Sequence, residues 1–253
     1  MKNASAGFLL SMQFLTRIPV PVEVPWNAQT SRWALRAYPL IGLLIGLIPV
    51  LFVWMEVSFS PLVQAMMIVT FFVWISGGLH LDGWMDVFDA AGSNAPLDKK
   101  WEIMKDPHVG SFGIAALLFL LGWKVVLVHE LLVQEASPLI FMIYPALARW
   151  KAAVLLTVVP AAKPSGLAHT WQKHITGKDA FLAGVPFAAA FIFSGSFLFI
   201  WAAFGAGIFL VLYRLWILKH FKGINGDLAG ASIEGGELWT LFILWIFISS
   251  GMV

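Results

Sequence analysis

The sequence predicts an all-α, polytopic integral membrane protein, and its composition, its apolar segments and the charges of its loops all support this fold class. Of the 253 residues, 60% are hydrophobic and only 12% are charged, whereas a soluble domain carries about 25% charged residues. A soluble fold of this size cannot bury so much apolar surface, so lipid must solvate much of the chain. The length allows about seven spans of roughly 20 residues in a single transmembrane domain over residues 1–253.

Seven apolar segments are predicted to form the transmembrane helices, and the fifth of them is short. They are residues 38–55, 62–79, 112–129, 139–159, 181–193, 197–218 and 238–253. Residues 8–20 are too few and too polar to cross a membrane. We therefore expect an N-terminal amphipathic helix that lies in the membrane interface.

Lysine and arginine fall on one side of this predicted topology. The N-terminal segment and the loops at 80–111, 160–179 and 219–237 contain them, and the three intervening loops contain none. An excess of Lys and Arg marks the cytoplasmic side of a bacterial inner membrane. We therefore predict a multi-pass protein of that membrane with its N-terminus inside, its C-terminus outside and cytoplasmic catalytic loops at about 80–111 and 219–237.

Two classes of site are excluded by composition. The chain contains no cysteine, so it has neither disulfides nor thiolate metal sites. Its net charge is only +2 and it has no basic run or tail, so we expect no nucleic-acid partner.

The first group of acidic residues predicts a metal site. Asp82, Asp86 and Asp89 stand at positions i, i+4 and i+7, so on a helix they share one face. Their mutual repulsion destabilises a helix by a few tenths of a kcal/mol for each pair, and a divalent cation would remove it. Mg²⁺ is suited to one or two carboxylates combined with substrate phosphates. The alternative is a solvated helix end that Asp82 caps. His80 is either a ligand or base or, as we favour, a hydrogen-bonding residue behind the ligands.

A second group lies further along the same predicted loop. Glu102 and Asp106 are four residues apart, and Lys105 between them has the charge to contact a phosphate. Gly110 and Ser111 precede the next span, and free N–H groups at a helix N-terminus bind phosphate oxygens. The alternative is an ordinary capped start of a transmembrane helix.

A third group lies in the last predicted loop. Asp227 and Glu234 are seven residues apart, and the small residues Gly226, Gly230 and Ala231 lie near them. Small residues allow close helix packing, so we expect Asp227 to lie near the Asp82 face and to form one site with it. The alternative is a helix N-terminus that acids stabilise.

Three basic residues lie inside the apolar segments, namely Lys124, Arg149 and Lys151. A charge at that depth is costly when unpaired and marks a functional site by default. Arg149 is the best candidate to bind a phosphate or a buried carboxylate, and Lys124 has the alternative of extending to the interface.

Together these residues resemble the cobalamin synthase (adenosylcobinamide-GDP ribazoletransferase) family, in order and over nearly the whole chain. The resemblance rests on segments 13–19, which includes Arg17, and 38–46, and on acidic motifs at 77–89, 102–113 and 226–237. The most specific pieces are Gly-Gly-Leu-His-Leu-Asp-Gly at 77–83 and Glu-Ile-Met-Lys-Asp at 102–106. The chain departs from the family pattern at Pro107-His108, where Ser-Arg is usual, and at Lys99-Lys100, where two arginines are usual.

The resemblance implies the joining of adenosylcobinamide-GDP to α-ribazole or its 5′-phosphate, with release of GMP. It agrees with a Mg²⁺-dependent phosphoryl transfer, which needs positioned charge and a base. We predict that Asp82, Asp86 and Asp89 bind the metal and that Glu102, Lys105 and Asp106 also take part in catalysis. The predicted substrate-binding residues are Arg17, His80, Arg149, Asp227 and Glu234.

The rival interpretation is a membrane transporter for a divalent cation or for the corrinoid. A transporter would place its acids near the bilayer midplane on interrupted helices. The predicted topology places most of them at cytoplasmic helix ends instead. The partners expected are the two substrates and membrane lipid, and the sequence leaves open whether the chain forms a homo-oligomer.

Overall fold

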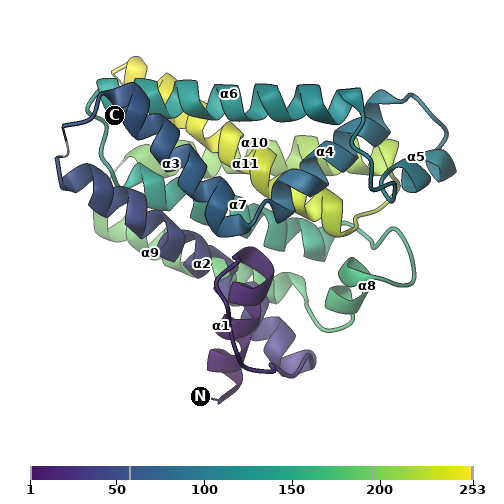
Figure 1. Cartoon of the computed structure of the whole chain (residues 1–253). Helices are drawn as coiled ribbons and strands as arrows, with labels where there is room; N and C mark the ends of the chain where they lie inside the picture. The colour runs from purple at the N-terminus through teal and green to yellow at the C-terminus, as the bar shows by residue number, and fades with distance from the viewer. Residues whose placement is uncertain (1, 57, 195–196, 252–253) are drawn as a thin grey trace.

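The computed structural model describes residues 2–56, 58–194 and 197–251, and this part of the chain folds into helices without a β-sheet (Figure 1). The helices are α1 (Lys2–Leu15), α2 (Ala28–Trp54), α3 (Pro61–Ser76), α4 (Leu79–Gly92), α5 (Leu97–Ile103), α6 (Ser111–Val133), α7 (Ile140–Val158), α8 (Leu167–Gln172), α9 (Gly177–Ser194), α10 (Phe197–His220) and α11 (Gly226–Ser249). The predicted all-α polytopic membrane fold is confirmed.

Five helices within the described residues are long and apolar enough to cross a membrane: α2, α6, α7, α10 and α11. Helices α3 and α4 add a sixth span if they are counted as one broken span, because they are bent by 90° at a short break. The fifth segment that the sequence predicts as a span, 181–193, falls within α9. Side chains 188 and 190–193 of that span lie outside the described residues, so its status as a span stays a prediction.

Several helices extend beyond the apolar segments that predicted them. The α2 helix begins at Ala28 because the Asn27 side chain accepts hydrogen bonds from the backbone N–H groups of Gln29 and Thr30. The α11 helix begins at Gly226 because Asn225 caps it by accepting from Leu228 N at 2.9 Å. Residues 226–237, which we predicted as part of a loop, are therefore helical, as are 79–92 and 97–103 in the other predicted loop.

The break between α3 and α4 is built from two glycines. Gly77 and Gly78 both have positive φ, at 65° and 77°, a region that is open to glycine and unfavourable for other residues. Gly77 ends α3 and Gly78 begins α4. The paired glycines thus turn the chain so that α4 runs beside α6 and α11 (Figure 1).

The centre of the bundle is α7, which packs against α2, α9 and α11. Its contact with α2 is close because a Cβ at Gly42 would overlap the backbone of Ala146. The N-terminal helix α1 packs on α2, where Ser11 Oγ donates to Ala34 O at 2.7 Å. The predicted N-terminal helix is therefore present, and its position in a membrane interface stays a prediction.

Candidate active site

The acidic faces of α4 and α11 meet where the two helices pack. Gly83 of α4 lies against Asp227 of α11, and a Cβ at Gly83 would be 2.9 Å from Asp227 O and 3.0 Å from its Cα. Further along the contact, a Cβ at Gly230 would lie 3.5 Å from His80 Cα. The small residues therefore bring Asp227 beside α4, which is the approach that the sequence predicts.

Three carboxylates gather at this contact. Asp82 is exposed, and Asp86 and Asp227 are half-buried. Asp82 and Asp227 both lie near enough to repel the charge of Asp86. Asn225 Nδ2 donates to Asp227 Oδ2 at 2.7 Å, but no described Lys or Arg forms an ion pair with any of the three. The result is a concentration of negative charge that the described residues leave uncompensated.

Mg²⁺ is the cation that these carboxylates suit. The described residues contain no group of three or more His, Asp or Glu side chains placed to hold a metal ion on their own. Mg²⁺, however, usually takes one or two protein carboxylates and completes its octahedron with water and substrate phosphates. Asp82, Asp86 and Asp227 are thus oxygen ligands of a kind that Mg²⁺ would fit, and Mg²⁺ binding itself stays a prediction.

Asp89 has a different environment from the other two aspartates on its face. Its carboxylate accepts hydrogen bonds from Gly110 N at 2.7 Å and Gly113 N at 2.8 Å. These groups belong to the N-terminal end of α6, where N–H groups have no partner within the helix. A Cβ at either glycine would overlap the Asp89 carboxylate. Asp89 thus joins α4 to α6, and its role as a metal ligand stays a prediction.

The predicted catalytic residues Glu102, Lys105 and Asp106, at the end of α5 and just after it, lie on the surface, without a described hydrogen bond or ion pair to Asp82, Asp86 or Asp227. Glu102 pairs with Lys99 at 2.9 Å. Asp106 accepts hydrogen bonds from His108 N at 2.9 Å and from its ring at 2.7 Å, and the backbone bond especially lowers the pKa of Asp106. This carboxylate is therefore ionised at neutral pH and is a weak base. Lys105 is exposed.

Two of the predicted substrate-binding residues flank the start of α4. Arg17 is exposed, and its guanidinium lies 5.4 Å from the centre of the Trp74 ring, next to the Gly77 turn. His80 is only 4% exposed, and its Nδ1 has no hydrogen-bond partner among the described residues.

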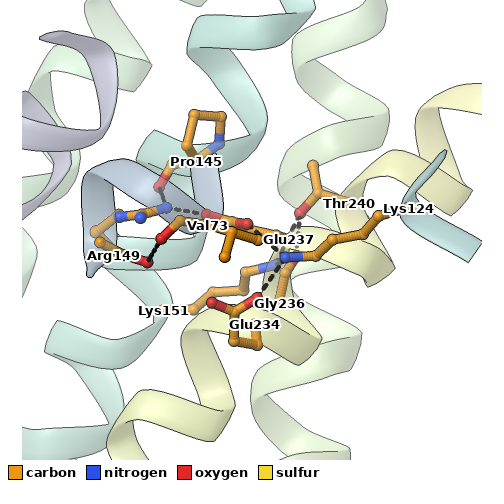
Figure 2. Close-up of polar contacts among 10 residues, drawn as sticks. Val73, Lys124, Pro145, Arg149, Lys151, Glu234, Gly236, Glu237 and Thr240 are labelled. Atoms are coloured by element: carbon orange, nitrogen blue, oxygen red, sulfur yellow. Dashed lines mark hydrogen bonds and ion pairs between the residues drawn. The ribbon is translucent and has the colours of Figure 1, made fainter. Parts of the chain in front are cut away.

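A buried ion-pair network joins α6, α7 and α11 (Figure 2). Lys124 donates to Glu234 at 2.5 Å and to Glu237 at 2.7 Å, and Arg149 pairs with Glu237. Nearby, Lys151 Nζ donates to Gly236 O at 2.6 Å and to Thr240 Oγ1 at 2.8 Å. All of these charged side chains are at most 6% exposed. Two cations and two carboxylates thus compensate one another inside the bundle.

This network changes the interpretation of three residues. Arg149 and Glu234, which were predicted to bind substrate, are each buried in an ion pair with another helix, and their substrate contact stays a prediction. For Arg149 the partner is a buried carboxylate, which is one of the two alternatives that the sequence offers. Lys124 does not extend to the interface. Sequence reasoning missed the role of Glu237, although its spacing from Glu234 places both on one face of α11.

The sequence of the chain matches a known protein family. A family model described as Cobalamin-5-phosphate synthase matches residues 7–245. The chain belongs to this family.

The relatives of this cobalamin-5-phosphate synthase family member span its whole length. Proteins named adenosylcobinamide-GDP ribazoletransferase from Geobacillus sp. (strain WCH70) and Halalkalibacterium halodurans are 38% and 37% identical to it, over 100% and 99% of both chains. A protein of that name from Geobacillus kaustophilus is 37% identical over 100% of both chains. No solved structure matches the chain significantly. The protein is a transferase of cobalamin biosynthesis.

The contact between α4 and α11 makes a first prediction. Gly83→Ala would place a methyl group against the Asp227 backbone and would force the two helices apart, which typically costs about 1–3 kcal/mol. We expect a lower unfolding temperature and a lower transfer rate, measured on the purified protein. Gly122→Ala is the matched control, because nothing lies within 4 Å of a Cβ there. A Gly83→Ala protein with unchanged stability and rate would contradict the close contact.

Proposed function

We propose that the protein transfers the adenosylcobinamide phosphoryl group from adenosylcobinamide-GDP to a hydroxyl of α-ribazole or its 5′-phosphate, at the cytoplasmic side of the inner membrane and with Mg²⁺. The new bond joins the hydroxyl oxygen to the phosphorus nearer the corrinoid. The bond from that phosphorus to the bridging oxygen breaks, GMP leaves, and the hydroxyl proton passes to a base or to water.

The observation that carries this proposal is the uncompensated acidic cluster of Asp82, Asp86 and Asp227, in a chain whose full-length relatives carry the name ribazoletransferase. Phosphoryl transfer needs little covalent chemistry from the protein, so positioned charge is the main contribution. A bare carboxylate cluster repels a diphosphate, and it favours one only together with a cation. The transporter alternative does not explain the family membership.

The proposed roles of the site residues follow from their positions on α4, on α11 and near the start of α4. Asp82 and Asp86, on one helix, would hold Mg²⁺, which supplies charge neutralisation for the diphosphate and the leaving group. Asp227 approaches from the other helix and would accept a hydrogen bond from the attacking hydroxyl. Arg17, exposed beside the start of α4, would contact a phosphate or the substrate entering the site.

The reaction can be tested directly. Purified protein in lipid nanodiscs, incubated with adenosylcobinamide-GDP, α-ribazole and Mg²⁺, should release GMP and form adenosylcobalamin in equal amounts. Omission of α-ribazole or of Mg²⁺ should abolish both products. Release of GMP without a corrinoid product would contradict the joining reaction.

The proposed orientation makes a second prediction. Because the chain has no cysteine, single cysteines can be introduced at four exposed positions: Asn94, Ser165, Ser60 and Ser137. In intact cells, a membrane-impermeant thiol reagent should label the cysteines at 60 and 137 only. Those at 94 and 165 should react only after the membrane is opened. External labelling at position 94 would overturn the proposed cytoplasmic site.

A further inference from the structure

A partly open cavity of about 140 Å³ lies beside the α4–α11 contact. Helices α1, α2, α4, α7, α8 and α11 all contribute to its wall, and Tyr38, His80 and Asp227 are its ionisable members. Asp227 therefore belongs both to this cavity and to the acidic cluster. A molecule in the cavity would reach the reaction centre through Asp227.

Most of the wall is apolar and aromatic. Trp171 packs edge-on against Phe14 and Tyr38, with ring centres 5.4 and 5.8 Å apart, and all three rings line the cavity. Leu79, Leu156 and Ile233 are further apolar members of the wall. Pockets for small molecules typically have this composition, in which an apolar lining carries a few placed polar groups.

His80 is a polar residue of the cavity wall, together with Tyr38 and Asp227. It is 4% exposed, and its Nδ1 lacks a hydrogen-bond partner among the described residues. A buried polar atom without a partner is unfavourable. Because the His80 residue lines the cavity, a ligand bound there would supply a partner for its ring. A neutral imidazole donates from one ring nitrogen and accepts at the other.

The size and charge of the cavity select among the chemical parts of the two substrates. An apolar cavity of about 150 Å³ is known to bind a benzene-sized ring, and a corrin ring is several times larger. No Lys or Arg belongs to the described wall, so the cavity does not suit a diphosphate. Guanine and adenine carry several hydrogen-bonding groups that this mostly apolar wall would leave unpaired. What remains is a planar, apolar heterocycle with one free hydrogen-bonding ring nitrogen.

We propose that this cavity binds the base of the acceptor nucleoside, with the His80 imidazole hydrogen bonded to the free ring nitrogen of the benzimidazole. The assignment rests on the proposed function. The base lies among Phe14, Tyr38 and Trp171, and the ribose extends toward Asp227, whose carboxylate accepts a hydrogen bond from a ribose hydroxyl. The cavity thereby determines the side from which the acceptor approaches the acidic cluster. Its size and lining also determine which bases the enzyme accepts.

The size of the cavity can be tested with a pair of acceptors. Ala168 of α8 is 4% exposed and lines the cavity, so Ala168→Val removes room for about two methyl groups. We expect kcat/KM for α-ribazole to fall relative to that for the riboside of unsubstituted benzimidazole, changing their ratio by about tenfold, since one methylene in a pocket is worth that much discrimination. Ala115→Val, on the exposed face of α6, is the matched control and should leave the ratio unchanged.

The hydrogen bond can be tested with variants of His80. His80→Phe keeps an aromatic ring and removes both nitrogens, so the KM for α-ribazole should rise about tenfold, the equivalent of one hydrogen bond. The KM for adenosylcobinamide-GDP should stay unchanged. His80→Asn, which keeps polar atoms near the Nδ1 position, should restore acceptor binding. A purely structural role for His80 would change both KM values or the unfolding temperature instead.

Equilibrium dialysis of α-ribazole against the nanodisc protein separates this assignment from the transfer reaction. Saturable binding of α-ribazole that is weakened by both His80→Phe and Ala168→Val supports the cavity assignment. If the same preparation binds α-ribazole in this way but releases no GMP, the proposed transfer is overturned and the cavity assignment stands. A protein that releases GMP normally, but whose acceptor binding and acceptor ratio are unaffected by both variants, overturns the cavity assignment and leaves the transfer intact.

Discussion

Replacing Asp82 or Asp86 with Asn is expected to lower the rate of GMP release by about 10²-fold or more, which corresponds to the loss of several kcal/mol of electrostatic stabilisation. Each substitution removes a charge and almost no volume. Because the described residues leave both carboxylates without an ion pair, the folded protein should remain in the membrane at normal levels. The measurement is turnover at saturating substrate and Mg²⁺, together with the unfolding temperature.

Asp98→Asn is the matched control for this experiment. Asp98 is an exposed residue of α5, so it has the same charge change without the contact to α11, and turnover should be normal. Asp89→Asn should differ in its stability both from the Asp82 and Asp86 variants and from the Asp98 control. An amide oxygen cannot replace both carboxylate oxygens that accept from Gly110 and Gly113, so this variant should also unfold at a lower temperature. Normal turnover in both Asp82→Asn and Asp86→Asn would show that this face of α4 is only a solvated helix surface without a role in catalysis.

Replacing Glu237 with Gln is expected to destabilise the protein by about 3–5 kcal/mol, the usual result when one member of a buried ion pair is removed. In the unmutated protein, Arg149 pairs with Glu237 and Lys124 also pairs with Glu234 (Figure 2). Without the Glu237 charge, the carboxylate of Glu234 would be left to compensate both cations, and Arg149 would lose its partner. The measurement is thermal or denaturant unfolding in detergent. Glu102→Gln, which breaks an exposed pair with Lys99, is the control and should leave unfolding unchanged.

A double-mutant cycle tests whether the pairing itself stabilises the bundle. Lys124→Met and Glu234→Gln should each destabilise the protein, and the double variant should be less destabilised than the sum, by about 0.5–3 kcal/mol. Strict additivity would show that the two side chains do not depend on each other. An unchanged stability in Glu237→Gln would show that water or lipid headgroups compensate these charges in place of the partner helices.

Much of the fold could be predicted from the sequence because apolar length is a local property. The spans containing α2, α6, α7 and α10 follow directly from runs of apolar residues. The approach of Asp227 to α4 could also be predicted, because Gly83, Gly226 and Gly230 leave room for a close helix contact. Both inferences depend on residue size and polarity, which a single sequence displays.

The network could not be predicted because it joins residues that are far apart in the chain. Glu234 and Glu237 make the first turns of α11 look like a polar loop, and their neutralisation by Lys124 and Arg149 is visible only once α6, α7 and α11 are packed. The same limit applies to Asp89. Its spacing groups it with Asp82 and Asp86, whereas its partners are backbone N–H groups more than twenty residues away.

The distribution of the network among three helices has a consequence for biogenesis. On insertion scales a central Lys or Arg opposes transfer of a helix into lipid by about 2.5–3.5 kcal/mol. Helices α6 and α7 leave the ribosome with Lys124 and Arg149 before either glutamate has been translated. These cations would therefore remain unpaired, in water or next to an insertase near the translocon, until α11 has been synthesised. Helix α11 therefore has to be inserted before the network can form, and a nascent chain that stalls before Gly226 would leave three cations, Lys124, Arg149 and Lys151, without their α11 partners.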